Sequence, residues 1–229
     1  MKLQYLVTGM PRSGTVYMAR LLTSAGLMCG HESIFALDGI EGAIKALSDE
    51  YVKTSVVSND VPESWFNHRT QVAESSYLAA PFLDHSCLAD TKIIHVVRNP
   101  LLVISSLLLD VNFFKERGQI PYLDFVYKHL PELKKINNEI ERITAYYVWW
   151  SNIIEQKSLG KQYLRIKVEE SVGSPLFDFL EKKQPENLFT NTKINSWKKR
   201  KKNICLNEIP NGKIKDEFEE MTEKYNYLF

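Results

Sequence analysis

The stretch from Tyr5 to Leu22 constrains the fold most, because it joins an apolar run to a helical pattern through a glycine-bearing turn. It reads YLVTGMPRSGTVYMARLL, and Gly9 and Gly14 have the spacing of the first half of the phosphate-binding motif G-x-x-x-x-G-K-S/T. Backbone N–H groups of such a turn, with the N-terminus of the next helix, form an anion site whatever the side chains are. The stretch therefore predicts a strand, a turn and a helix of an α/β sheet.

The turn lacks the lysine of nucleotide triphosphatases. Thr15 stands where that motif has lysine, and Val16 stands where it has the Ser or Thr that holds magnesium. Arg12 is the only cation inside the turn, and its guanidinium stays protonated at physiological pH. We therefore expect an anion site that needs no metal, and a magnesium-dependent ATPase is disfavoured. The alternative is a tight strand-to-helix turn with an incidental surface arginine.

The rest of the chain continues to alternate strands and helices. Strands are predicted over Leu3–Val7, Val56–Val57, Val72–Ala73, Lys92–Val97 and Gln162–Val168. Helices are predicted over Thr15–Ala25, Asp38–Leu47, Leu101–Leu109, Tyr122–Leu130, Glu139–Glu155, Pro175–Lys182 and Lys213–Lys224. This order predicts a single α/β domain over residues 1–229, with a short parallel sheet flanked by helices, like a P-loop nucleotide-binding fold, and a helical C-terminal half.

Ligands of such sheets bind beyond the carboxyl ends of the strands. Four loops should therefore converge there, those that follow Val7, Cys29, Val72 and Val97.

Composition limits the classes of partner. The net charge is +1, so no global charge favours nucleic acid or a membrane surface, and an anion site must be local. The longest apolar stretch, LLVISSLLL, is too short to span a membrane, and Arg12 ends the first apolar run too early for a signal peptide. Three scattered cysteines, Cys29, Cys87 and Cys205, indicate buried reduced thiols rather than disulfides. We expect a cytoplasmic protein without a transmembrane segment; its oligomeric state stays open.

A second strand-to-helix junction lies at RNPLLVISS. Arg98 ends an apolar strand, and Pro100 occupies the first turn of the next helix, where proline is well accommodated. The junction places a guanidinium beside a helix N-terminus, and an arginine with a serine hydroxyl can hold a phosphate monoester. Taken alone, an ion pair at the edge of the sheet is the better interpretation of Arg98.

Taken together, PRSGT and RNPLLVISS resemble the two cofactor motifs of the cytosolic-type and Golgi-type sulfotransferases. In that family the first motif, usually P-K/R-S-G-T-T, binds the 5′-phosphosulfate of PAPS (3′-phosphoadenosine 5′-phosphosulfate), and the second binds its 3′-phosphate. The resemblance implies cofactor-binding roles for Pro11, Arg12, Ser13, Gly14, Thr15, Val16, Arg98 and Ser106. Val16 departs from the usual second threonine. Tyr17 stands where several members carry an adenine-stacking tryptophan, and a core position explains it equally well.

Two later stretches resemble the family more weakly. YLRIKVEES is similar to a strand of the family that ends in R/K-x-E-D/E before a late helix. NSWKKRKK stands where the family has a basic loop over the 3′-phosphate, which implies contacts from Lys198, Lys199 and Arg200. A nucleic-acid-binding module built on this run is a competing interpretation, but clustered cations usually form a solvated face.

Sulfuryl transfer to a hydroxyl needs a base that removes the hydroxyl proton. The candidates are His31, Glu32, Glu74, His85 and His95. His95 lies within an apolar strand and is interpreted as a core histidine. His85 resembles a cap or a surface residue.

The segment MCGHESIF resembles the C-G-E-E-T segment of protein-tyrosine sulfotransferases, whose second glutamate is the base. Aligned through Cys29-Gly30, that glutamate falls on Glu32, although the preceding segment is one residue shorter here. His31 orients Glu32 or acts in its place. Glu74 lies where cytosolic members have a K-T-H segment, and no histidine occurs there, which favours Glu32.

The resemblance therefore implies a sulfotransferase that moves the sulfuryl group of PAPS to a hydroxyl acceptor, with Glu32, Arg12 and His31 catalytic and no metal. The acceptor could be a sugar or glycan, a lipid headgroup, a phenol or another small molecule, and no nucleic-acid partner is expected. Aromatic residues at Tyr146, Tyr147, Trp149 and Trp150 could line its pocket, yet their helical spacing places most of them in the core. The alternative function is a nucleotide or small-molecule kinase with a divergent P-loop.

Overall fold

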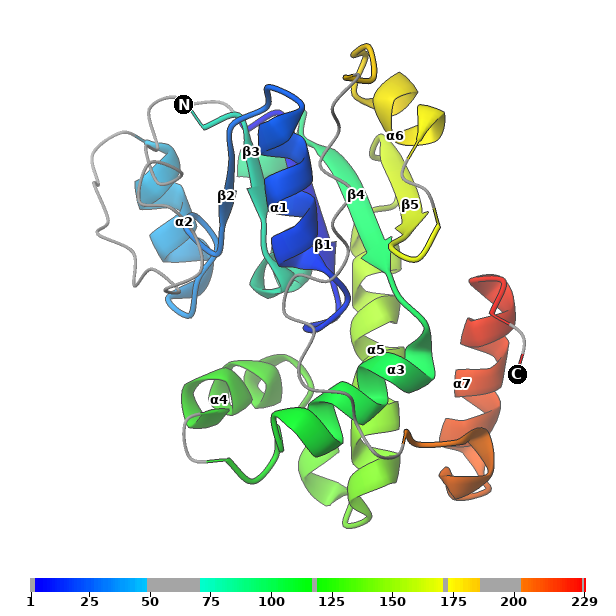
Figure 1. Cartoon of the computed structure of the whole chain (residues 1–229). Helices are drawn as coiled ribbons and strands as arrows, with labels where there is room; N and C mark the ends of the chain where they lie inside the picture. The colour runs from blue at the N-terminus through cyan, green and yellow to red at the C-terminus, as the bar shows by residue number, and fades with distance from the viewer. Residues whose placement is uncertain (1–2, 49–70, 117–118, 171–172, 186–202, 228) are drawn as a thin grey trace.

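The computed structural model of the protein describes residues 3–48, 71–116, 119–170, 173–185, 203–227 and 229. Within these ranges a five-stranded, all-parallel sheet lies between layers of helices (Figure 1). In chain order, its strands are β1 (Tyr5–Gly9), β2 (Cys29–His31), β3 (Ala73–Ser75), β4 (Lys92–Val97) and β5 (Tyr163–Lys167). Their order across the sheet is β2-β3-β1-β4-β5, which confirms the predicted α/β class with a short parallel sheet.

Helices account for most of the described residues in the second half of the chain, as predicted. The α-helices are α1 (Thr15–Ser24), α2 (Gly39–Leu47), α3 (Pro100–Ser105), α4 (Ile120–His129), α5 (Glu139–Lys157), α6 (Ser174–Phe179) and α7 (Lys213–Lys224). The 3-10 helices are η2 (Tyr77–Phe82), η3 (Ser86–Leu88), η6 (Pro131–Lys135) and η7 (Leu206–Glu208). A π-helical turn, η4 (Ser106–Asp110), continues α3.

Alternation along the central strand fills a core on each face of the sheet. Leu6 is buried in the core that α3, α5 and η2 cover, whereas Tyr5 and Val7 are buried in the core that α1 and α6 cover. This is the period-two pattern of a strand covered on both sides. Tyr146 and Trp150 of α5 are fully buried in the first core, so the expectation that most aromatics of this helix are core residues is confirmed.

The connections after β1 and β4 leave the sheet on opposite faces. β1 leads to α1, whose Met18 and Leu22 pack in one core, while β4 leads to α3, whose Val103 and Ile104 pack in the other (Figure 1). Because β1 and β4 are neighbours, their carboxyl ends flank a crevice at which ligands of open α/β sheets bind. The predicted convergence of loops at this edge is therefore built into the strand order.

Several expectations need correction or lie outside the described residues. Cys29 is buried, but Cys87 and Cys205 are exposed, so the prediction of buried thiols is wrong for two of the three, all of which are free. The Val56–Val57 strand and the 198–200 contacts fall in ranges that the structure does not describe.

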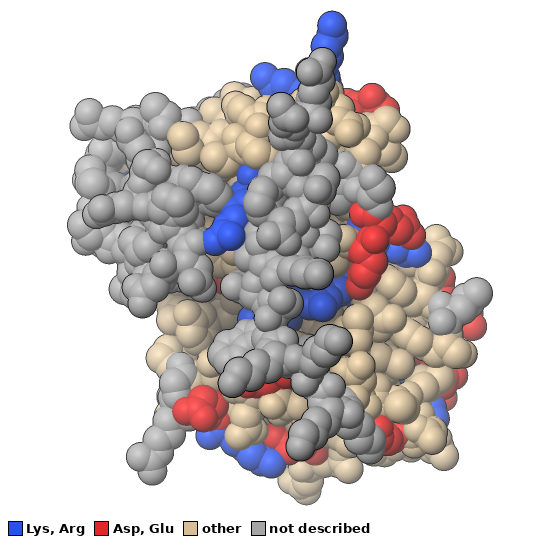
Figure 2. Space-filling model, in the orientation of Figure 1, with Lys and Arg blue, Asp and Glu red and all other residues tan. Residues whose placement is uncertain are grey.

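Two features of the described surface bear on partners. None of the described helices combines the length and the apolar composition that crossing a membrane requires. On the face shown in Figure 2, Lys and Arg side chains are interspersed with Asp and Glu rather than gathered into one field.

Candidate functional site

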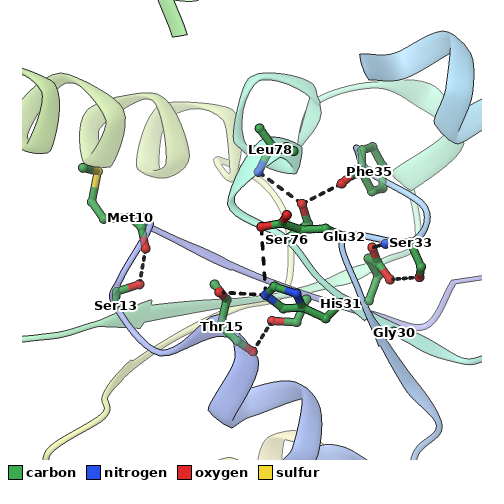
Figure 3. Close-up of polar contacts among 12 residues, drawn as sticks. Met10, Ser13, Thr15, Gly30, His31, Glu32, Ser33, Phe35, Ser76 and Leu78 are labelled. Atoms are coloured by element: carbon green, nitrogen blue, oxygen red, sulfur yellow. Dashed lines mark hydrogen bonds and ion pairs between the residues drawn. The ribbon is translucent and has the colours of Figure 1, made fainter. Parts of the chain in front are cut away.

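The turn after β1 is closed by Ser13, whose backbone N–H and side-chain hydroxyl both donate to the Met10 carbonyl, at 3.1 and 2.6 Å (Figure 3). A Cβ at Gly9 would collide with the Val96 carbonyl, and Gly14 has φ of 107°, in the left-handed region that favours glycine. Both glycines of the motif are therefore required by the path of the backbone. The Ser13 side chain stabilises the turn and does not line the adjacent cavity.

The N-terminus of α1 opens into a cavity of about 550 Å³. The hydrogen bond from Met18 N to Gly14 O, at 3.0 Å, joins the first turn of the helix to Gly14, so the N–H groups before Met18 belong to the helix N-terminus. These groups carry the partial positive charge of the helix dipole. Thr15, Val16 and Tyr17 line the cavity at this point, which suits an anion.

The cavity gathers most of the residues that the sequence singled out. From the predicted site it is lined by Pro11, Arg12, Gly14, Thr15, Val16, Tyr17, His31, Glu32 and Arg98. It is completed by Tyr77, Leu107, Val111, Phe113, Gln119, Tyr122, Val168 and Glu169. Tyr17 is 5% exposed and packs in the core beneath α1, so the core position is confirmed, and its contact with an adenine stays a prediction.

Two arginines from distant parts of the chain meet in this cavity. Arg98 Nη1 donates to the Arg12 carbonyl oxygen at 3.1 Å, across 86 residues of sequence. Arg12 Nε donates to Ser106 Oγ at 3.1 Å, and Ser106 in turn donates to Asp110 Oδ2 at 2.8 Å. Ser106 is fully buried behind Arg12 and does not line the cavity, so it acts on the site through the Arg12 guanidinium. Both predicted motifs thus converge on one wall of the cavity.

Glu32 and His31 form the opposite part of the site, at the end of β2. Glu32 has φ of 51°, a conformation that non-glycine residues seldom adopt and that functional sites often contain. His31 Nε2 lies 3.2 Å from Thr15 Oγ1 and 4.0 Å from Glu32 Oε1 (Figure 3). The histidine therefore joins the start of α1 to the carboxylate, and the Thr15 hydroxyl contacts this ring.

Burial sets the charge of these two groups. Burial, and after it the negative charge of Glu74, raises the pKa of Glu32 to about 7. Burial lowers the pKa of His31 to about 4, so the imidazole is neutral at neutral pH. A carboxyl group that titrates near neutral pH is suited to general base catalysis, whereas His31 is suited to orienting it.

Glu74 lies inside β3 and not in the loop where the sequence placed it. It is fully buried, and both oxygens of its carboxylate accept hydrogen bonds from protein groups. It does not line the cavity, so it is no candidate for a base. The two remaining histidine candidates lie as predicted. His95 is buried, with its Nδ1 2.7 Å from Tyr163 Oη, and His85 accepts a capping hydrogen bond from Cys87 N.

The sequence did not identify Glu169 or the aromatic part of the cavity. Glu169 Oε1 accepts from Asn99 N at 2.7 Å, and its Oε2 accepts from the Tyr227 hydroxyl at 2.7 Å. This carboxylate therefore stabilises the turn that follows Arg98. The weak match of YLRIKVEES was the available signal for it. Tyr77 begins η2 two residues after β3 ends, and its place near the carboxyl end of that strand was the signal that it lines the cavity.

In comparisons with known proteins, the chain matches no family model and no curated protein. The function must therefore be argued from the chemistry of the cavity itself.

Proposed function

We propose that the protein is a PAPS-dependent sulfotransferase. The observation that carries the proposal is the meeting of Arg12 and Arg98 at the N-terminus of α1, in one cavity with Glu32. Two guanidinium groups and a helix N-terminus suit a ligand with two separate anionic groups, as PAPS has. A carboxylate on the other side suits the activation of a neutral nucleophile.

The described residues fit the cofactor. Arg12 and the first-turn N–H groups of α1 would bind the 5′-phosphosulfate, because Gly14 lets the backbone approach and the helix dipole places partial positive charge at these groups. Arg98 would bind the 3′-phosphate, and Tyr17 would contact the adenine. When bound, PAPS supplies a sulfuryl group attached to a good leaving group.

Three residues of the chain would then have separate roles in the transfer. Glu32 would take the proton from the acceptor hydroxyl at its carboxylate, and neutral His31 would hold that carboxylate in place. Arg12 would stabilise the negative charge that develops on the leaving oxygen, since it is a fixed cation that needs no reorganisation. Because Thr15 and Val16 replace the lysine and Ser/Thr of nucleotide triphosphatases, a kinase is the weaker alternative.

The remaining wall of the cavity supports an acceptor with an aromatic or aliphatic body. The rings of Tyr77 and Tyr122 lie 6.3 Å apart and line the cavity with Leu107 and Phe113. Burial raises the pKa of Tyr122, and the charge of Glu32, which lines the same cavity, adds to this. A hydroxyl carried on a ring held here would be near Glu32.

PAP (adenosine 3′,5′-bisphosphate) should raise the melting temperature of the protein in the absence of magnesium, and ATP should raise it less. The reason is that a ligand of the folded state stabilises it more the more tightly it binds, and the site offers two arginines but has Val16 where the Ser or Thr that holds magnesium would stand. Differential scanning fluorimetry with PAP, ATP and GTP, each with EDTA or with magnesium, measures this. A larger, magnesium-dependent shift with ATP would favour the kinase.

The dependence of kcat/KM on pH should distinguish the two candidate bases. If Glu32 is the base, kcat/KM rises as the pH rises through about 7, because the carboxylate must be ionised. If His31 were the base, the rise would centre near pH 4, where its imidazole loses its proton. An initial-rate profile from pH 4 to 9 with any acceptor found by screening decides between them.

A further inference from the structure

The carboxylate of Glu74 holds the turn that carries Glu32. Glu74 Oε1 accepts from Ser33 N at 2.7 Å and from Ile34 N at 2.9 Å. Its Oε2 accepts from Ser33 Oγ at 2.7 Å and from Gln71 Nε2 at 2.6 Å. Burial raises the pKa of the Glu74 carboxyl, and these four hydrogen bonds oppose that shift because they favour the ionised form. The two residues that follow Glu32 are thus fixed to β3.

Ser75 of β3 and Ser76, which follows it, also bind the turn that carries Glu32 or the start of α1. Ser75 O accepts from Glu32 N at 3.2 Å, and Ser75 Oγ donates to the Thr15 carbonyl at 2.8 Å. Ser76 Oγ donates to the Phe35 carbonyl at 2.7 Å (Figure 3). Every polar side chain from Glu74 to Ser76 is therefore bonded to the Glu32 turn or to the start of α1.

Gly30 makes room for this network. A Cβ at this position would lie 2.5 Å from Glu74 Oε2 and would also collide with Ser33 Oγ and Gln71 Nε2. The glycine two residues before Glu32 is therefore needed because a carboxylate and its donors pack against the backbone there.

We infer that Glu74 is the positioning residue of this site: it fixes the turn that directs Glu32 into the cavity and keeps a second negative charge beside that carboxylate. The inference rests on the proposed function for its catalytic consequence, because it gives the base its place and its basicity. The left-handed conformation of Glu32 supports it, since such a conformation persists only where surrounding bonds enforce it.

Glu74 is one of several titratable or charged groups around Glu32. Titratable or charged side chains face Glu32 from each element around it: His31 of β2, Glu74 of β3, Tyr77 of η2, Tyr122 of α4, Tyr146 of α5 and Arg12 of the cofactor turn. Burial is the main cause of the raised pKa of Glu32, and Glu74 is the second. Removal of the Glu74 charge should lower that pKa without restoring the ordinary value.

Two substitutions separate the charge from the hydrogen bonds. Glu74→Gln removes the charge, while its amide oxygen can still accept from the Ser33 and Ile34 N–H groups. Glu74→Met has a similar size and accepts nothing, so the turn is released. ¹³C NMR of protein labelled at the glutamate carboxyls follows the titration of Glu32, whose resonance is assigned with Glu32→Gln; turnover and the melting-temperature shift with PAP are measured on the same samples.

We expect the Glu32 carboxyl to titrate at lower pH in E74Q than in the wild type, and the acid limb of kcat/KM to move with it. Above pH 8, where Glu32 is ionised in both proteins, E74Q should lose only the turnover that the lower basicity of Glu32 costs, whereas E74M should lose about a hundredfold, as a misplacement of about 1 Å does. Both variants should still respond to PAP.

An unchanged Glu32 titration in E74Q, or wild-type turnover in E74M, overturns the inference. If E74M does not fold, the E74Q titration still decides. Failure of the wild type to respond to PAP would instead count against the proposed function, and the titration would remain a test of Glu74 because it needs no substrate.

Discussion

Glu32→Gln should reduce turnover by about two to four orders of magnitude, the range that a general base contributes. The substitution keeps the size of the side chain and its position after β2, but an amide cannot take the proton of an acceptor hydroxyl. PAP should bind nearly as in the wild type, because its anionic groups are assigned to Arg12, Arg98 and the start of α1. Steady-state rates with a screened acceptor, and calorimetric titration with PAP, measure the two effects separately.

Glu169→Gln is the matched control for this experiment. It also removes a carboxylate charge from the lining of the cavity, but both oxygens of Glu169 are bonded, to Asn99 N and to the Tyr227 hydroxyl. Its loss of turnover should be much smaller than that of Glu32→Gln. Near-normal turnover in Glu32→Gln, combined with a large loss in His31→Ala, would transfer the role of base to His31.

The fold could be predicted from the sequence largely because the turn after β1 requires glycine at two positions. Gly9 and Gly14 are required by a close backbone contact and by a positive φ, and an apolar run before such a turn indicates a strand. The end of β1 was predicted too early, at Val7, because Thr8 is polar. In the structure Thr8 is fully buried and pairs with His95 of β4, so neighbouring strands extend β1 beyond the apolar run.

Only some residues of the candidate site could be predicted from the sequence. Arg12 and Arg98 were found because each follows a strand and precedes a helix, and parallel strands bring such positions to one edge. Glu74 was misplaced because its partners Ser33 and Ile34 lie 41 and 40 residues away, so no local pattern marks it as buried and bonded. Tyr77 and Tyr122 have the spacing of core residues, and only the packing of η2 against α4 shows that they also face a cavity.

Arg98→Ala should weaken the binding of PAP about ten- to a hundredfold more than the binding of AMP, which lacks only the 3′-phosphate. A hydrogen bond to a charged group contributes about 1.5–3 kcal/mol, and each 1.4 kcal/mol or so is a factor of about ten in affinity. The comparison is necessary because Arg98 also donates to the Arg12 carbonyl, so its removal loosens the turn that binds both ligands. Calorimetric titration of each ligand at one fixed ionic strength measures the difference.

Arg12→Ala provides the contrast, since Arg12 is assigned to the 5′ group that PAP and AMP share. It should weaken the two ligands by similar factors, and it should also slow turnover because the charge on the leaving oxygen loses its partner. If Arg98→Ala likewise weakens PAP and AMP equally, its guanidinium only supports the turn through the Arg12 carbonyl. The 3′-phosphate would then have to be bound elsewhere, and the resemblance of RNPLLVISS to the second cofactor motif would lose its chemical meaning.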